Sequence, residues 1–167
     1  MDIDSRFIDW LKYEVLCRKQ YTLQGSRWPT ERLTYTISSY PDPLQLSSQD
    51  VQSEIARALT VWSRVTPLTF EYRRPVRGPS QDHVDIDIKF EVGDHGDADP
   101  FDGLGGTLAH AFFPVWGGDI HFDKEEKFTK GRNYGTNLMQ TSAHEFGHSL
   151  GLRCSDMIQD SNVQRKV

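Results

Sequence analysis

The segment 143–154 (AHEFGHSLGLRC) combines residue types that can bind a metal ion and transfer a proton. His144 and His148 stand four positions apart, so on a helix both imidazoles project from one face toward one ion. Glu145 directly follows the first histidine and is placed to act as general base toward a water at that ion. The segment therefore predicts a zinc site with hydrolytic chemistry, carried by a helix.

Two further residues of this segment, Gly151 and Cys154, decide how the metal site is completed. Gly151 is expected to end the helix, because glycine enters a left-handed turn at no steric cost. The long form of the motif, H-E-x-x-H-x-x-G-x-x-H, has a histidine three residues later, where this chain has Cys154. A thiolate binds zinc at about 2.3 Å, but its sulfur lies closer to the backbone than the far nitrogen of histidine. We expect Cys154 to be a third ligand only if the segment after Gly151 lies roughly 2 Å nearer the ion.

A second group of metal-binding residue types precedes the helix. His95, Asp97, His110 and His121 supply three nitrogens and one oxygen, with no position left for water. That composition is typical of a closed, structural zinc site. If Asp97 only formed a turn, the three histidines would be left without an explanation. His83 is a single histidine outside these groups and is interpreted as a surface residue.

Carboxylates interleave with these histidines and indicate a third kind of site. Asp102, Asp123 and Glu126 are hard oxygen ligands, and the glycines near them leave backbone carbonyls able to point inward. About six oxygens in a flexible arrangement suit calcium better than magnesium. Asp85 and Asp119 are candidates for a second calcium ion.

Length and composition limit the classes of protein that need to be considered. The chain has 167 residues, which suits one domain, and a net charge of −5 without a basic run of the kind that binds nucleic acid. It has no apolar stretch of the roughly 20 residues that a membrane span needs. Residues 1–6 are too charged for a secretory signal peptide. Cys17 and Cys154 are too few for a disulfide framework, although they could pair with each other.

Periodicity predicts an α/β domain with a mixed sheet. Residues 1–26 differ in pattern from the rest and are interpreted as an extension whose last part, 21–26, is a linker. The domain then covers residues 27–167. One helix is predicted to begin at a capping pair, Ser47 and Asp50, and to end before Pro67. A second helix over 136–150 carries the zinc motif. Alternating strand patterns occur at 33–37, 68–72, 84–92, 107–113 and 119–122.

With these residues in view, residues 27–152 resemble the catalytic domain of a matrixin, a matrix metalloproteinase of the metzincin clan. The resemblance implies an α+β fold with a five-stranded twisted mixed sheet and two long helices, without the family's last helix. It also implies a catalytic zinc, a structural zinc and calcium. The matching stretches, in order, are RW at 27–28, VWS at 61–63, TPLTF at 66–70, FDG at 101–103, LAHAF at 108–112 and HFD at 121–123.

The same resemblance assigns the peptide-binding edge and the metal ligands to particular residues. The exposed edge at 106–112 would bind an extended peptide as an added strand. The catalytic zinc would fall on His144 and His148, with Cys154 in the third position. The structural zinc would be bound by His95, Asp97, His110 and His121. Calcium would be bound by Asp102, Gly103, Gly105, Thr107, Asp123 and Glu126, with the glycines and the threonine contributing carbonyl oxygens.

The function implied by the resemblance is that of a monomeric zinc metalloendopeptidase. It would be secreted and would hydrolyse peptide bonds of extracellular matrix proteins through a zinc-activated water, with Glu145 as the catalytic base. Two alternatives follow from Cys154 and from Met157, which comes too soon for the family's methionine turn. One is a metal-stabilised pseudoprotease or truncated, non-catalytic isoform that retains a peptide-binding groove. The other is a product that does not fold stably.

Overall fold

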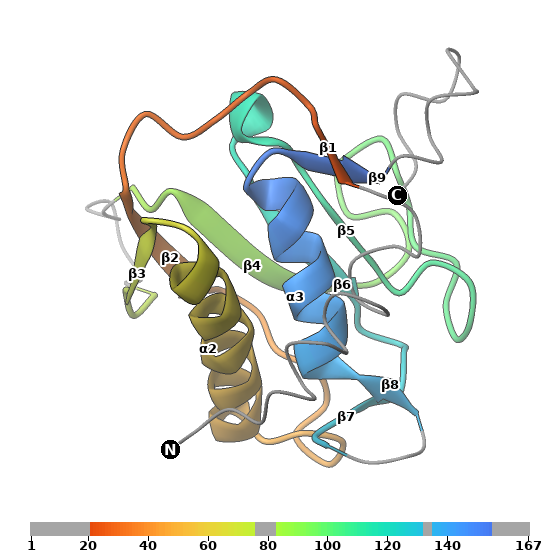
Figure 1. Ribbon diagram of the computed structural model, residues 1–167. Helices are drawn as coiled ribbons and strands as arrows, with labels where there is room; N and C mark the ends of the chain where they lie inside the picture. The colour runs from red at the N-terminus through yellow and green to blue at the C-terminus, as the bar shows by residue number, and fades with distance from the viewer. Residues whose placement is uncertain (1–20, 76–82, 132–134, 155–167) are drawn as a thin grey trace.

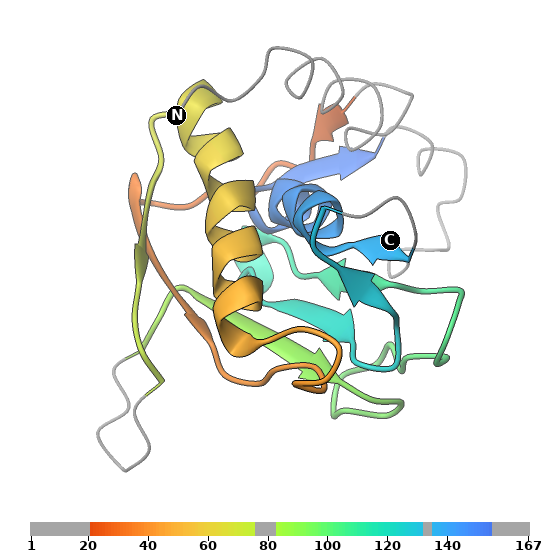
Figure 2. The ribbon, with the colours of Figure 1, turned by 90° about the horizontal axis from the view of Figure 1, so that it is seen from below.

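A computed structural model of the chain describes residues 21–75, 83–131 and 135–154 (Figure 1). Within them a five-stranded sheet is covered on one face by two helices, α2 (Ser48–Val65) and α3 (Leu138–Ser149). Figure 2 shows both helices on the same side of the sheet. This is the α+β architecture with two long helices and a mixed sheet that the sequence predicts.

The order of strands in the sheet is β3-β2-β4-β6-β5, with β5 at one edge. The strands are β2 (Arg32–Ile37), β3 (Thr69–Tyr72), β4 (Ile86–Glu91), β5 (Ala109–Ala111) and β6 (Ile120–Asp123). All neighbours pair in parallel except β5, which runs antiparallel to β6. The mixed character of the sheet therefore comes from β5 alone, and this strand also presents the free edge nearest α3.

Helix α2 begins where its capping residue predicts. The Ser47 hydroxyl accepts a hydrogen bond from the backbone N–H of Asp50 at 3.1 Å, and the hydroxyl itself contacts the Asp50 carboxylate. This arrangement satisfies one of the amide groups that a helix leaves free at its start. The helix ends at Val65, and Thr66, the residue before Pro67, is its C-cap. Its buried face consists of Val51, Glu54, Ile55, Ala58, Leu59 and Trp62.

The core between sheet and helices fixes where α3 lies. The Trp62 indole N–H donates to the carbonyl of Ala143 at 2.9 Å, so a buried side chain of α2 holds the backbone of α3 one residue before the zinc motif. Below the helices, Phe90 and Phe122 stack with centroids 5.0 Å apart and Phe128 meets both edge-on. The position of the zinc motif is therefore determined by the main hydrophobic core.

The segment 21–26 differs from the linker that the sequence predicts. Its first part forms strand β1 (Tyr21–Leu23), which pairs antiparallel with β9 (Leu152–Cys154). Tyr21 lies opposite Cys154 in this register, and the Gln24 N–H donates to the Gly151 carbonyl at 2.9 Å. A strand of three residues is too short to show an alternating pattern, and its partner lies at the other end of the domain. Residues 1–20, including Cys17, and Met157 lie outside the described residues.

Three smaller elements complete the described part of the chain. They are a 3₁₀ turn, η2 (Pro114–Trp116), and a short parallel pair, β7 (Phe128–Thr129) with β8 (Thr136–Asn137). Strand β8 leads directly into α3, whose first turn is capped by the Asn137 side chain accepting from the Gln140 N–H at 3.1 Å. Among the described helices, none is both long and apolar enough to cross a membrane.

Candidate metal centres and active site

The two histidines of α3 point their outer nitrogens at each other. The Nε2 atoms of His144 and His148 are 3.1 Å apart. The Nδ1 atom of His148 lies 2.8 Å from the Leu152 carbonyl oxygen, and because a carbonyl can only accept, Nδ1 carries the proton. This contact leaves Nε2 of His148 with a free lone pair and fixes the plane of the ring, which is the usual way a zinc-binding histidine is oriented.

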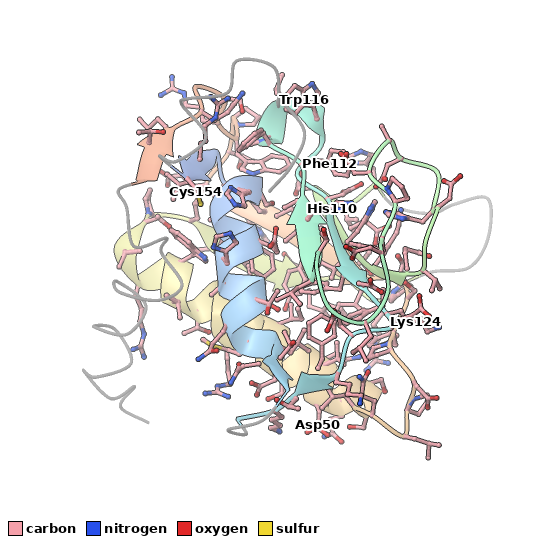
Figure 3. The ribbon with its side chains drawn as sticks, turned by 90° about the vertical axis from the view of Figure 1, so that its right-hand side faces the viewer. Asp50, His110, Phe112, Trp116, Lys124 and Cys154 are labelled. Atoms are coloured by element: carbon pink, nitrogen blue, oxygen red, sulfur yellow. The ribbon has the colours of Figure 1, made fainter. Side chains whose placement is uncertain are left out.

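Cys154 is brought to the same place by the turn and strand that follow α3. One ligand atom of each of His144, His148 and Cys154 lies within 4.8 Å of the others. Around a tetrahedral zinc, a sulfur and a nitrogen ligand are about 3.6 Å apart, so a small local shift would suffice. Figure 3 shows Cys154 near the end of α3. In this structure Cys154 is disulfide-bonded, and Cys17 is the other cysteine of the chain.

Glu145 is buried beside the histidine pair. Its residue is only 4% exposed, and its Oε2 atom has no hydrogen-bond partner among the described residues. Burial raises the pKa of the Glu145 carboxyl to about 8. A divalent cation beside it would favour the carboxylate and lower that pKa. A buried carboxyl group whose Oε2 atom has no partner among the described residues, next in the chain to a metal-ligand histidine, is the arrangement expected of a proton acceptor at a metal site.

Three contacts that sequence reasoning missed hold the end of α3 in place. The Trp28 indole donates to the Ser149 carbonyl at 2.9 Å, and the Ser149 hydroxyl donates to the Gly118 carbonyl at 2.7 Å. The third is the bond from His148 to the Leu152 carbonyl. Each of these hydrogen bonds joins residues that are brought together only by the tertiary fold or by the turn after α3. No sequence pattern therefore predicts these bonds.

Gly151 makes the turn between α3 and β9. Its φ is +96°, and an added Cβ would come closer than 3.0 Å to the carbonyl oxygen of Ser26. We expect Gly151→Ala to lower the free energy of unfolding by at least about 2 kcal/mol, since it combines an unfavourable φ with a backbone clash. Gly117→Ala is the matched control, because its φ is +100° but nothing lies within 4 Å of the added Cβ. Equal urea midpoints for the two variants would contradict the clash.

The second cluster has the geometry of a closed metal site. The Asp97 Oδ2 atom lies 2.8 Å from His95 Nε2, 3.0 Å from His110 Nε2 and 2.9 Å from His121 Nδ1. His110 Nε2 and His121 Nδ1 are 3.2 Å apart, as expected for residues that face each other across β5 and β6. Ligands about 2.0–2.1 Å from a tetrahedral zinc are about 3.3–3.4 Å from one another. Three imidazole nitrogens around one carboxylate oxygen therefore fit a zinc ion within a few tenths of an ångström.

The protonation of this cluster also suits a metal. Burial lowers the pKa of His110, and it lowers the pKa of His121 to about 4. Both imidazoles are therefore neutral near pH 7 and have a lone pair to offer. The ring stack continues outward, with His95 and His110 both stacked on Phe101 at 4.7 and 4.8 Å. This aromatic packing fixes the ring planes before any ion binds.

The predicted calcium carboxylates surround one glycine-rich loop. Asp102 accepts from the Thr107 N–H at 3.0 Å, Asp123 accepts from the Gly103 N–H at 3.0 Å, and Glu126 accepts from the Gly105 N–H. Asp123 and Glu126 are buried, and no ion pair within the described part of the chain involves either. The structure brings these side chains to one loop, and their role as calcium ligands stays a prediction.

Asp85 and Asp119, the candidates for a second calcium, make separate contacts. The Asp85 carboxylate accepts from the backbone N–H and hydroxyl of Thr34, both at 2.7 Å, whereas Asp119 accepts from the Asp87 N–H at 2.8 Å. Burial raises the pKa of Asp119. Neither residue belongs to the metal-like groups found among the described residues. The second calcium therefore remains a prediction without geometric support.

Strand β5 forms the edge that was predicted to bind peptide, although it covers only Ala109–Ala111 of the expected 106–112. It runs beside α3, and one of its edges is paired with β6 while the other is free of strands in the described sheet. Figure 3 shows His110 on this strand, with Phe112 and Trp116 following it along the chain. An extended peptide added to this edge would lie close to α3 and its histidines.

The comparisons with known proteins agree with this fold and site. A family model described as Matrixin matches residues 27–161. Stromelysin-3 of Xenopus laevis is 50% identical over 142 residues, covering 84% of this chain and 28% of that protein. Human stromelysin-3 is 49% identical over 138 residues, covering 81% and 27%. Human matrix metalloproteinase-16 is 39% identical over 176 residues, covering 92% and 28%.

The chain therefore belongs to the matrixin family. It spans slightly more than a quarter of the length of these curated relatives, and the matched part includes both histidine clusters, β5 and α3.

Proposed function

We propose that this chain is a zinc-dependent endopeptidase acting on extended peptide segments of extracellular matrix proteins. The observation that carries the proposal is the pair of Nε2 atoms of His144 and His148, 3.1 Å apart, beside the buried carboxyl group of Glu145. Membership of the matrixin family and the names of the relatives support the same chemistry.

In this proposal His144, His148 and the reduced thiolate of Cys154 would hold the catalytic zinc, which when bound supplies Lewis acidity to the scissile carbonyl and to an attacking water. The bond from His148 to the Leu152 carbonyl keeps the ring in the tautomer that can ligate. Glu145 accepts the proton that the attacking water loses and then delivers it to the leaving amine. Its burial excludes bulk water from this transfer.

Substrate binding is assigned to the free edge of β5. An extended peptide that pairs with this edge gains main-chain hydrogen bonds regardless of its sequence, while alternate side chains enter neighbouring pockets. Such pairing orients the scissile bond along the sheet and toward α3. The partner is therefore an unfolded or extended stretch of a protein, and no nucleic acid is involved. We assign the chain as a monomer in this activity.

An oxidising location is part of the proposal. Cys154 is disulfide-bonded, and disulfides form and persist chiefly in secreted and extracellular proteins. The names of the relatives, stromelysin and matrix metalloproteinase, support the same assignment.

The cluster of His95, Asp97, His110 and His121 is assigned a structural zinc, because it offers four ligands and no position for a reactant. The loop 102–107 with Asp123 and Glu126 is assigned one calcium ion. Buried carboxylates that lack a cationic partner are costly, and a bound cation would remove that cost.

Calcium removal is expected to loosen this loop. Adding calcium to protein dialysed against calcium-free buffer that contains zinc should raise the melting temperature, since the ion binds only the folded loop. Asp123→Asn should lower the melting temperature and abolish the dependence on calcium, because Asp123 is fully buried there. Asp42→Asn serves as the control, because Asp42 is an exposed turn residue that is distant in sequence from the loop 102–107 and from Asp123. A melting temperature independent of calcium in the wild type would remove this site.

The test of the proposed activity is cleavage of a quenched fluorescent peptide by the purified, reduced chain with zinc and calcium supplied. Turnover that a zinc chelator abolishes supports the endopeptidase. Cys154 favours a second candidate, a metal-stabilised pseudoprotease that binds peptide without cleaving it, because this residue stands where the long zinc motif has histidine. Peptide binding without cleavage would favour that candidate.

A further inference from the structure

We infer that the redox state of Cys154 controls whether the site on α3 can hold a zinc ion. The inference rests on the proposed zinc site and concerns a regulation that the histidine of the long motif could not provide. Reduced, Cys154 is the third ligand beside His144 and His148; in a disulfide it is not, and the metal is released.

The Cys154 sulfur lies where it could form either a disulfide bond or a bond to zinc. A sulfur that is disulfide-bonded in this structure lies within 4.8 Å of ring nitrogens of both histidines. Cys154 is only 6% exposed, at the end of a strand that β1 holds in register. The two bonds draw on the same sulfur, so they exclude each other.

The ligand chemistry gives the switch its direction. The zinc ligand is the thiolate, and a disulfide sulfur carries no charge and donates weakly. Without the thiolate, His144 and His148 supply only two protein ligands, whereas catalytic zinc sites have three. Oxidation should therefore weaken zinc binding at α3 while leaving the cluster around Asp97 unchanged, because that cluster contains no sulfur.

The step balances with a small-molecule thiol as reductant. Two thiol molecules supply two electrons: the disulfide bond at Cys154 breaks, one sulfur–sulfur bond forms between the reductant molecules, and the two protein sulfurs take up the two protons. Zinc then displaces the thiol proton of Cys154 as the sulfur–zinc bond forms. Linkage makes the effect reciprocal, so bound zinc should also make the disulfide easier to reduce.

The experiment counts zinc ions on the full chain in both redox states. The protein is prepared oxidised or reduced with a phosphine, freed of the reductant under anaerobic conditions, dialysed against buffered zinc and analysed for metal. We expect about two ions per reduced chain and about one per oxidised chain, with affinity at the weaker site changing at least tenfold. Cobalt(II) in place of zinc should show a sulfur-to-metal charge-transfer band only in the reduced chain.

Variants separate failure of the switch from failure of the zinc site. Cys154→Ala should hold about one ion in both states, and Cys154→His about two in both states. Cys17→Ser should hold about two ions in either buffer, since no second cysteine remains in the chain. Equal zinc content in the oxidised and reduced wild type would overturn the switch. If Cys154→His also failed to gain the second ion, the proposed catalytic zinc site itself would be wrong.

Discussion

Glu145→Gln is expected to reduce the rate of peptide hydrolysis by about 10²–10⁴-fold while leaving the fold and the zinc content unchanged. Glutamine has the shape of glutamate but cannot accept the proton that the attacking water must lose. Because Glu145 is buried and its Oε2 atom has no described partner, an amide nitrogen in the place of Oε2 breaks no described hydrogen bond. The measurement is kcat/KM on a quenched fluorescent peptide, together with zinc content.

Glu31→Gln is the matched control, since Glu31 is an exposed glutamate just before β2, far from α3 in the sequence. It should leave hydrolysis unchanged. If the wild-type chain cleaves too slowly to measure, the same pair is compared in the Cys154→His background. Glu145→Gln with wild-type turnover, in either background, would remove Glu145 from the mechanism.

A second readout of the same variant comes from stability with metal stripped by a chelator. Burial raises the pKa of Glu145 from 4.5 to about 8, so the folded chain holds this proton more tightly than the unfolded chain. Its contribution to stability is present below about pH 4.5 and is lost as the pH rises through about 8. Glu145→Gln cannot ionise. Its free energy of unfolding, measured with urea, should therefore rise relative to that of the wild type by about 1.4 kcal/mol for each pH unit between about 4.5 and 8.

The zinc motif was predictable from the sequence because its geometry is local. Histidines four residues apart must share a face of any helix, and Gly151 supplies the positive φ that ends it. The sheet was likewise predictable, because β2 and β4 alternate apolar and polar residues over a length that shows the period. Where the sequence dictates spacing within one element, a prediction needs no knowledge of the rest of the fold.

The features that escaped prediction all depend on distant partners. Strand β1 is three residues long and was interpreted as a linker, since only β9 makes it a strand. The composition of the second cluster pointed to zinc, but that His110 faces His121 across β5 and β6 follows from strand register, which the sequence did not specify. The proximity of Cys154 to the histidine pair has the same origin: Gly151 turns the chain, and β1 then holds it.

Removing the structural zinc is expected to cause the largest loss of stability. An ion present at about 1,000 times its Kd stabilises the folded chain by about 4 kcal/mol. At about 2–4 °C per kcal/mol for a domain of this size, the melting temperature should fall by about 8–16 °C. His110→Ala should show this loss, and added zinc should raise its melting temperature less than that of the wild type. His83→Ala, an exposed histidine outside both clusters, should behave as wild type.

The stability gained from zinc must be separated from the packing of the imidazole itself. His110 stacks on Phe101 with centroids 4.8 Å apart, so its replacement removes aromatic contacts whether or not a metal binds. The relevant quantity is therefore the rise in melting temperature on adding zinc, measured for each protein. Acid provides an independent check, because protons compete for the neutral imidazoles. The pKa of His121 is lowered to about 4 in the folded chain. The contribution of His121 to the free energy of unfolding is therefore present above pH 6.5 and is lost as the pH falls toward 4. A rise in His110→Ala equal to that of the wild type would mean that zinc stabilises this domain somewhere other than the cluster around Asp97.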